Sequence, residues 1–141
     1  LKADNGFTAF FIYASSEKNR MLACIFGKHC DNSRNSQSLY LVVVQKALKN
    51  IAKSARYTHL HLLPFYDYGS VDETKLDTPQ FNWGYDPVNY NVPEGSYSTD
   101  PYHGEVRVKE AKEMVKTLHD NDISVVMDVV YNHVYLSLIH I

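Results

Sequence analysis

The hydrophobic and polar positions from residue 58 onwards predict a strand, a long loop, a helix and a second strand. The apolar run "THLHLLPF" starts at Thr58 and stops at Pro64, which cannot donate a hydrogen bond to a sheet. It predicts a buried strand, the first one that the pattern makes readable. After a loop that reaches Asp100, the segment "GEVRVKEAKEMVKTLHDND" predicts an amphipathic helix. Its apolar residues recur at helical spacing: Val108, Ala111, Val115 and Leu118.

The end of this helix and the strand that follows are also marked in the sequence. Asn121 and Asp122 stand where the helix is expected to end, and both tolerate left-handed backbone better than most residues other than glycine. The next segment, "ISVVMDVVYNH", is almost continuously β-branched from Ile123 to Val130. Such a run predicts a parallel strand that is covered on both faces.

Strand, loop, helix and strand together predict a βαβ unit with two parallel strands. The carboxyl ends of these strands, near Pro64 and Asn132, then share one edge of the sheet. Ligands bind at that edge in open α/β sheets and in (β/α) barrels, and the loop leaves from it too. We therefore expect residues far apart in the sequence to meet there: Trp83, Tyr85, Asp86, Asp128, Asn132 and His133.

The loop is rich in aromatic residues, and the segment from Tyr66 to Tyr102 holds six of the chain's eleven tyrosines. A loop of this length is usually functional or disordered, and its aromatic content argues against disorder. An aromatic face with a polar rim suits a sugar, because the C–H face packs on the ring while the hydroxyls seek Asp, Asn or His. The alternative is a hydrophobic cluster that holds the loop in place, and it stays open for rings such as Tyr90 and Tyr97.

Two polar residues near the expected edge are candidates for function. Asp128 interrupts an apolar run, and a buried carboxylate must be paired or must shift its pKa. A functional or supporting role is favoured over an ion pair with an arginine. His133 lies at the ligand edge, which favours ligand contact over a structural role. The acids of the loop are expected to be solvated charges without a catalytic role: Asp67, Asp72, Glu73, Asp77 and Glu94.

The composition excludes several classes of function. The formal net charge is -2 and no basic stripe is present, which argues against nucleic acid as a partner. No apolar run approaches the roughly 20 residues that span a bilayer, so we expect no membrane association. The start "LKADNGFTAF" lacks the order of a signal peptide, which leans towards a cytoplasmic location. Cys24 and Cys30 are expected to be free thiols, because two cysteines form neither a disulfide framework nor a metal site by spacing.

A family resemblance rests on three segments. "FNWGYDPVNYNVPEGSYSTDP" and "VVMDVVYNH" resemble the region that leads to the third barrel strand of type I pullulanases, glycoside hydrolases of the α-amylase superfamily. "HLHLLPFYDYGSVDE" is similar to the same enzymes, so the match runs from about Thr58 to Tyr135. Asp128, Asn132 and His133 carry a motif shared across the superfamily. "NWGYDP" and "YNVPEGSYSTDP" point to pullulanases and their close debranching relatives.

The resemblance implies an α/β fold, an incomplete (β/α)8 TIM barrel with roughly the first three strands. A complete barrel needs roughly 250 residues, so a chain of 141 cannot close one. The implied activity is cleavage of α-1,6 linkages in pullulan, glycogen or starch by the retaining route, with one carboxylate as nucleophile and one carboxylic acid as acid/base. In the family these groups and a third acid sit on later strands. We therefore expect this chain to be an inactive part of a larger hydrolase, with no catalytic residue of its own.

The resemblance also implies roles for single residues. By position, Tyr85 stacks on the glucose at the cleavage point, His133 bonds its hydroxyls and Asp128 orients neighbouring polar groups. Trp83 and Asp86 complete the expected substrate-binding set. No cofactor is implied for this chain. Asn132 corresponds to a position that helps to bind calcium in many amylases, but pullulanases need not use it, so a metal in the parent protein stays open.

Two other functions stay open beside the debranching hydrolase. A 1,4-α-glucan branching enzyme, or another member of the superfamily, is the enzyme alternative, although the sequence around Trp83 favours the hydrolase. A non-catalytic glucan-binding module would use the aromatic loop to bind without cutting. The expected partner is a branched α-glucan.

The chain is expected to have three parts. Residues 57–135 form the βαβ part of the catalytic barrel with its long aromatic loop. Residues 1–56 are poorly readable and hold either the first barrel elements or a frameshifted stretch. Residues 136–141, "LSLIHI", resemble the translated end of a sequencing adapter and are excluded from functional reasoning. The first residue, Leu1, and the apolar end also predict a cut from a longer reading frame.

Overall fold

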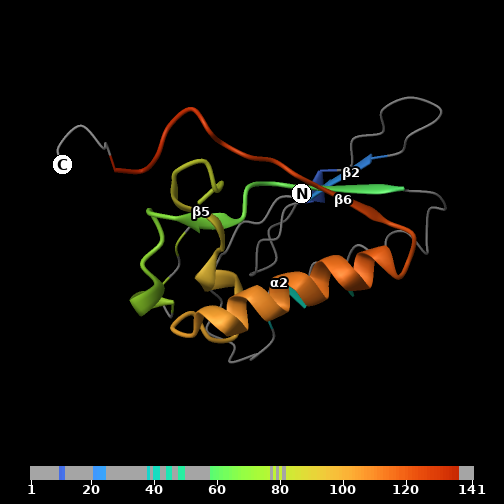
Figure 1. The fold of residues 1–141 in the computed structure, drawn as a ribbon, viewed down its shortest axis with the longest axis horizontal. Helices are drawn as coiled ribbons and strands as arrows, with labels where there is room; N and C mark the ends of the chain where they lie inside the picture. Colours follow the sequence, from blue (N-terminus) through green and yellow to red (C-terminus); the bar gives the residue numbers. More distant parts are fainter. Residues whose placement is uncertain are drawn as a thin grey trace.

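The computed structural model describes residues 10–11, 21–24, 38, 40–41, 44–45, 48–49, 58–76, 78, 80 and 82–136 (Figure 1). A four-stranded sheet has the spatial order β1 (Phe10–Phe11), β2 (Met21–Cys24), β3 (His59–Leu62) and β6 (Ser124–Met127). Strands β2, β3 and β6 are parallel, whereas β1 is antiparallel to β2. The described residues at 40–41, 44–45 and 48–49 are α-helical.

The predicted βαβ unit is confirmed. Strand β3 is followed by helix α2 (Gly104–His119) and then by β6, which pairs with β3 in parallel. Leu62 pairs with Met127, and the N–H of Asp128 donates to the carbonyl of Leu62 over 2.9 Å. The two carboxyl ends therefore share one edge of the sheet. In chain order β3 is the third strand and not the first, because two short strands precede it.

Strand β6 is shorter and less covered than the sequence predicted. It ends at Met127 rather than at Val130, and Asp128 contributes the last N–H that bonds to β3. Ser124 is exposed and the other three residues of the strand are partly buried. The β-branched run therefore continues past the point where its neighbour β3 ends at Leu62.

The segment predicted as one long loop contains regular structure. β4 (Tyr66–Tyr68) and β5 (Pro87–Pro93) form an antiparallel pair whose register shifts twice. Two short 3-10 helices, η1 (Glu73–Lys75) and η2 (Gly95–Tyr97), flank the second strand in the sequence. Figure 1 shows β5 beside helix α2. This hairpin anchors the aromatic segment to the βαβ unit.

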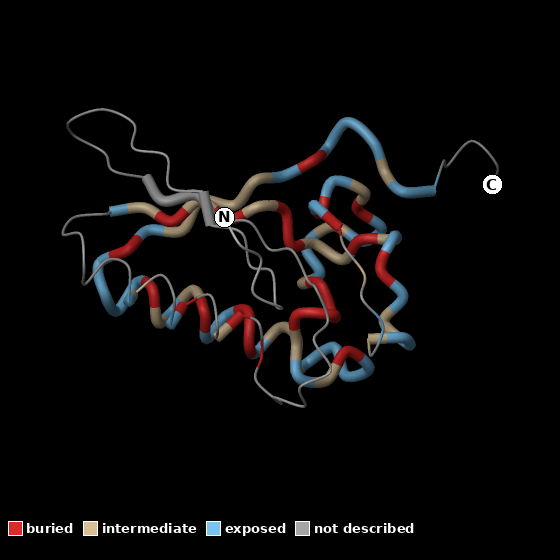
Figure 2. Tube along the Cα trace, turned by 180° about the vertical axis from the view of Figure 1, so that it is seen from behind, coloured by how far each residue is buried: buried red, intermediate tan, exposed pale blue. Residues whose placement is uncertain are grey.

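The core lies between α2, the sheet and the hairpin. Its buried apolar residues are Tyr40, Val44, Leu60, Leu62, Phe65, Tyr68, Val71, Tyr97, Ala111, Met114, Leu118 and Ile123. Along α2, buried and exposed positions alternate (Figure 2). The predicted helix face is right for Ala111 and Leu118, but Val108 and Val115 are only partly buried, and Met114 lies in the core instead. The buried stripe of α2 is thus rotated from the predicted one.

The end of α2 confirms the expected left-handed residue. Asp120 caps the helix and Asp122 has a φ of 59°, whereas Asn121 is not among the residues with positive φ. Because a side chain costs about 1–2 kcal/mol in this region and aspartate somewhat less, we expect Asp122→Gly to raise the free energy of unfolding by about 0.5–1 kcal/mol. Chemical denaturation measures this gain. Asn121→Gly is the matched control and should destabilise, since Asn121 Nδ2 donates to the carbonyl of Thr117 over 2.8 Å.

Some predictions fall outside the described residues. They include the state of Cys30, and the side chain of Cys24 in β2 is not described either. Residues 137–141 of the predicted adapter-derived tail also lie outside. Within the part that the structure describes, no helix has the length and apolar character needed to cross a bilayer.

Candidate functional site

Three of the predicted site residues meet at the shared edge of β3 and β6. The hydroxyl of Tyr85 donates to Asp128 Oδ2 over 2.6 Å. His133 Nε2 lies 2.7 Å from the carbonyl oxygen of Tyr85, and because a carbonyl only accepts, this nitrogen carries the proton. His133 Nδ1 is 3.2 Å from Asn132 Oδ1. The loop and the end of the second strand are therefore joined through Tyr85, although 43 residues separate Tyr85 from Asp128.

A tight turn delivers Tyr85 to this edge. The N–H of Gly84 donates to Asn82 Oδ1 over 2.8 Å, an arrangement in which an asparagine side chain replaces part of a backbone turn. Gly84 has a φ of 86°, and a Cβ placed there would collide with the carbonyl oxygen of Pro64. Only glycine combines this conformation with such close approach. The turn is thus pressed against Pro64, two residues after the end of β3.

The carboxylate of Asp86 holds the turn from the other side. Its Oδ2 accepts from the N–H of Ser70 over 3.0 Å and from the Ser70 hydroxyl over 2.5 Å. Its Oδ1 accepts from Asn82 Nδ2 over 2.6 Å. All of these hydrogen bonds join residues of the loop, so Asp86 stabilises the turn that positions Tyr85. Trp83 lies on the same turn with 48% of its surface exposed.

Tyr85 keeps its proton over the whole physiological range. Partial burial, together with the hydrogen bond to Asp128 and the charge of that carboxylate, raises the pKa of Tyr85 to about 12. The neutral phenol can donate to a carboxylate, whereas a phenolate could not. The phenol of Tyr85 therefore remains a hydrogen-bond donor to Asp128 throughout the physiological range.

The other loop tyrosines divide into two groups. Tyr97 belongs to the core: its ring is 1% exposed, contacts Tyr40 and Tyr68 edge to face, and its hydroxyl accepts from Tyr68 over 2.8 Å. Tyr90 lies nearer the site, since its hydroxyl donates to the backbone carbonyl of His133 over 2.9 Å. Tyr97 therefore belongs to a hydrophobic cluster that holds the loop in place, which was the alternative to sugar binding. Tyr90 instead supports the backbone beside the candidate site.

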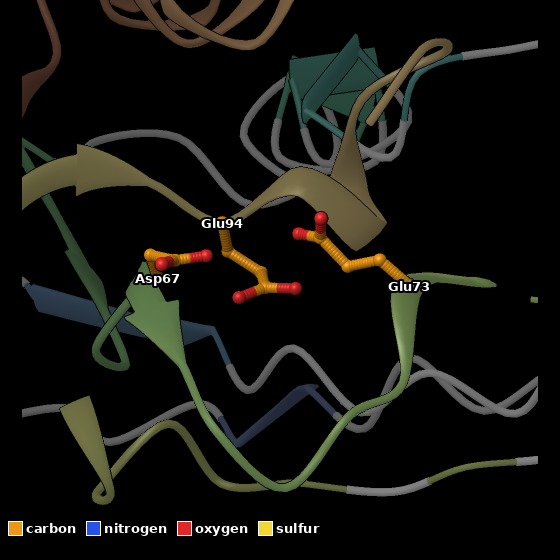
Figure 3. A group of neighbouring side chains, drawn as sticks. All are labelled: Asp67, Glu73 and Glu94. Atoms are coloured by element: carbon orange, nitrogen blue, oxygen red, sulfur yellow. The ribbon is translucent and has the colours of Figure 1, made fainter. Parts of the chain in front are cut away.

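A cluster of carboxylates lies on and next to the hairpin, where the sequence predicted solvated charges. Asp67, Glu73 and Glu94 each place an oxygen within 4.8 Å of the others (Figure 3). Glu94 is 0% exposed, and its two oxygens accept from the N–H groups of Tyr68 and Ser96, each over 3.0 Å. The prediction was wrong for Glu94, and Asp67 and Glu73 are also partly buried. Packing from distant segments, and not the local sequence, removes these acids from water.

Arg107 of α2 binds this cluster and compensates part of its charge. Its guanidinium lies 3.3 Å from Asp67 Oδ1 and 3.0 Å from Glu73 Oε2, and it also donates to the carbonyls of Pro93 and Pro101. The residue was missed, although a signal exists. Position 107 lies on the stripe that continues through Ala111, Met114 and Leu118, and a charge on a buried stripe needs an acidic partner.

The carboxylate cluster does not require a metal ion. It is the group of three or more potential ligands found in the described part of the chain, and Asn132 does not belong to it. Arg107 occupies the cluster with a positive charge, and backbone N–H groups engage both oxygens of Glu94. Glu73 Oε1 is buried without a hydrogen bond. We therefore describe the cluster as an ion-pair hub that joins α2 to the loop.

Comparison with known proteins shows which proteins this chain is similar to. No protein-family model matches the chain. The pullulanase of Bacillus subtilis is 46% identical over 84 residues, which is 59% of this chain and 11% of that protein. Chloroplastic pullulanase 1 of Arabidopsis thaliana is 36% identical over 131 residues, which is 70% of this chain and 14% of that protein. The chain is a relative of the pullulanases. The resemblance stated from its motifs is confirmed.

A solved pullulanase shares the local fold. The structure of the Paenibacillus barengoltzii pullulanase, in complex with maltohexaose and α-cyclodextrin, matches with a TM-score of 0.59 and 52% identity. The match covers 65% of this chain and 14% of that one. Pullulanase neighbours imply an α-amylase-type fold for the region, of which the described residues show two small sheets and helix α2. The chain spans 11% to 14% of the length of these three pullulanases.

Proposed function

We propose that the protein containing this chain is a debranching hydrolase that cleaves α-1,6-glucosidic bonds in branched α-glucans by the retaining route. The observation that carries the proposal is the convergence of Tyr85, Asp128 and His133, joined by contacts of 2.6 Å and 2.7 Å. An exposed ring beside a carboxylate and an imidazole suits a sugar, which offers both a C–H face and hydroxyls. The pullulanase relatives, one of them bound to maltohexaose, support the same substrate class.

Each site residue has a role in this proposal. Tyr85 stacks on a glucose ring, and Asp128 fixes the plane of Tyr85 through the hydroxyl. His133 offers its imidazole to the sugar hydroxyls while its Nε2–H donates to the carbonyl of Tyr85. Trp83 provides a further half-exposed ring, and Asp86 acts by holding the turn. The chain binds and orients, and the carboxylates that break the bond come from other parts of the protein.

The βαβ unit is part of a (β/α)8 barrel in this proposal, with residues 57–135 in the catalytic domain. Its edge then forms part of the carboxyl face on which barrels build their active sites. No metal enters the proposed action of this chain. Asn132 is the one residue at which calcium in the complete protein would be sought.

The proposal is tested on the complete protein with pullulan as substrate. We expect the release of reducing ends, and no release from the 141-residue chain under the same conditions. A complete protein that transfers glucan branches without releasing reducing ends would be a branching enzyme. One that binds glucan and cuts no linkage would be a binding module, and either result overturns the proposal.

The substitution Tyr85→Phe tests the roles of the residues. It keeps the ring and removes the hydrogen bond to Asp128, so we expect kcat/KM on pullulan to fall at least about tenfold, because a bond to a charged group contributes about 1.5–3 kcal/mol. Tyr85→Ala also removes the stacking face and should reduce it further. Tyr102→Phe is the matched control, since Tyr102 is exposed and lies before α2. Equal activity of Tyr85→Phe and the control would contradict the role given to Asp128.

A further inference from the structure

A second group of aromatic side chains lies next to the candidate site. The rings of Tyr66 and Tyr90 meet edge to face with centroids 6.2 Å apart, and those of Tyr90 and Tyr131 are tilted by 48° at 5.5 Å. We call these three residues the tyrosine trio. Tyr66 and Tyr90 belong to β4 and β5, whereas Tyr131 follows β6. The trio therefore joins the hairpin to the same strand end that carries Asp128 and His133.

The trio is connected to Tyr85 through a single residue. The hydroxyl of Tyr90 donates to the backbone carbonyl of His133 over 2.9 Å. The ring of His133 reaches the carbonyl of Tyr85 over 2.7 Å. His133 is thus hydrogen-bonded to Tyr85 through its ring and to Tyr90 through its backbone carbonyl. A glucan bound at His133 would therefore have one of these two aromatic residues on each side.

The trio differs from a cluster that serves only packing. Tyr40, Tyr68 and Tyr97 form such a cluster, and each of them is at most 4% exposed. Tyr131 is 68% exposed, so most of its surface contributes nothing to burial within this chain. An exposed aromatic ring that the chain does not bury is available to an apolar face of a ligand.

Contacts from below fix the orientation of the Tyr131 ring. Tyr90 packs against it, and the ring of Tyr66 packs against Tyr90 in turn. The Tyr66 hydroxyl also donates to Asn91 Oδ1 over 3.2 Å. In the sequence, Asn91 directly follows Tyr90 and Asn132 directly follows Tyr131, so two polar side chains are adjacent to the trio. A ring whose orientation is already fixed loses little conformational entropy when a ligand binds.

We propose that Tyr131, supported by Tyr90, is a second sugar-stacking residue that binds a further glucose unit of the α-glucan held at Tyr85 and His133. The proposal rests on the proposed function and adds a subsite to it. The ring of Tyr131 packs on the C–H face of the sugar, and its hydroxyl stays at the rim with Tyr66. Flat contact of this kind depends on the ring and not on the hydroxyl.

Maltotetraose binding to the complete protein, measured by titration calorimetry, tests this subsite. We expect the dissociation constant to rise about tenfold in Tyr131→Ala and in Tyr131→Leu, because leucine keeps apolar area but has no flat face. Tyr131→Phe keeps the ring and should bind within about twofold of the original protein. Tyr102→Ala is the matched control, since Tyr102 is 70% exposed and lies outside the trio.

The measurement separates failure of the subsite from failure of the proposed function. Tyr85→Ala is titrated beside the Tyr131 variants. If Tyr85→Ala weakens binding and Tyr131→Ala does not, the subsite is wrong and the proposed function stands. If neither substitution weakens binding, or the original protein binds no maltotetraose, both are wrong. Loss in Tyr131→Leu together with retention in Tyr131→Phe supports the stacking role.

Discussion

The 141-residue chain is expected to lose about 2–3 kcal/mol of unfolding free energy between pH 5 and pH 8 through Glu94. Burial raises the pKa of Glu94 from 4.5 to about 7 in the folded state, against the bonds from Ser96 and Tyr68, which lower it, and with a smaller upward effect of Glu73. In the unfolded chain the group ionises at its ordinary value. At a pH between these two pKa values, Glu94 has lost its proton in the unfolded chain but keeps it in the folded chain. The free energy of unfolding therefore falls as the pH rises and levels off above about pH 7.

The substitution Glu94→Gln isolates this effect. Glutamine has one acceptor oxygen, so it keeps one of the two bonds that Glu94 accepts from Tyr68 and Ser96. The lost bond costs about 1–3 kcal/mol, whereas the part of the pH dependence that comes from Glu94 should vanish and leave only that of His103. Denaturant unfolding at pH 5 and pH 8 gives both quantities. The comparison matters because the pKa of His103 is raised by its hydrogen bond to Asp100, and this pair also loses stability as the pH rises.

Glu113→Gln provides the matched control, since Glu113 is an exposed acid of α2 that is not among the groups that raise the pKa of His103. It should keep the pH dependence of the original chain. The groups that face Glu94 are charged or phenolic, namely Asp67, Glu73, Tyr68, Tyr97, Tyr40 and Arg107. If Glu94→Gln retains the full loss of stability between pH 5 and pH 8, one of these groups or His103 carries it and the assignment to Glu94 is wrong.

The sequence predicted the elements whose patterns are set locally. Strand β3 and helix α2 follow from an apolar run stopped at Pro64 and from apolar residues at helical spacing. The meeting of Tyr85 with Asp128 and His133 followed from the geometry of parallel strands, because their carboxyl ends share an edge. Local pattern and chain geometry were therefore sufficient for the centre of the candidate site.

The hairpin was missed because its pattern is not that of a strand. In β5, buried or partly buried positions do not alternate with exposed ones, and prolines stand at both ends. The register shifts twice against β4, so side chains change faces along the strand. No period of two survives in such a sequence, and the segment resembles a loop.

The buried state of Glu94 depends on residues far away in the chain. The hydroxyl of Tyr40 donates to the backbone carbonyl of Glu94 over 2.9 Å across 54 residues. The N–H of Tyr68, 26 residues away, donates to its side chain. An acid between Pro93 and Gly95 looks like a solvated turn residue until these partners are placed. Tertiary packing, and not the pattern around residue 94, decides its environment.

Replacing Arg107 with methionine is expected to destabilise the chain by about 3 kcal/mol, the largest single loss that the structure predicts. The methionine keeps apolar volume on α2 but leaves the carboxylates of Asp67 and Glu73 without their cation. The carbonyls of Pro93 and Pro101 lose a donor as well. The side chains of Arg107, Asp67 and Glu73 are mostly screened from water, so the two carboxylates left in the variant are poorly solvated. Denaturant unfolding at pH 7 measures the loss.

Two further variants separate the ion-pair hub from simple packing. Lys112→Met, on the exposed face of α2, is the matched control and should change stability by less than about 0.5 kcal/mol. Adding Asp67→Asn and Glu73→Gln to Arg107→Met removes the uncompensated charges and should restore about half of the loss. If Arg107→Met costs no more than the control, the carboxylates are solvated after all. If the added substitutions restore nothing, Arg107 acts by packing against the loop, because a hub of charges must respond to the removal of its anions.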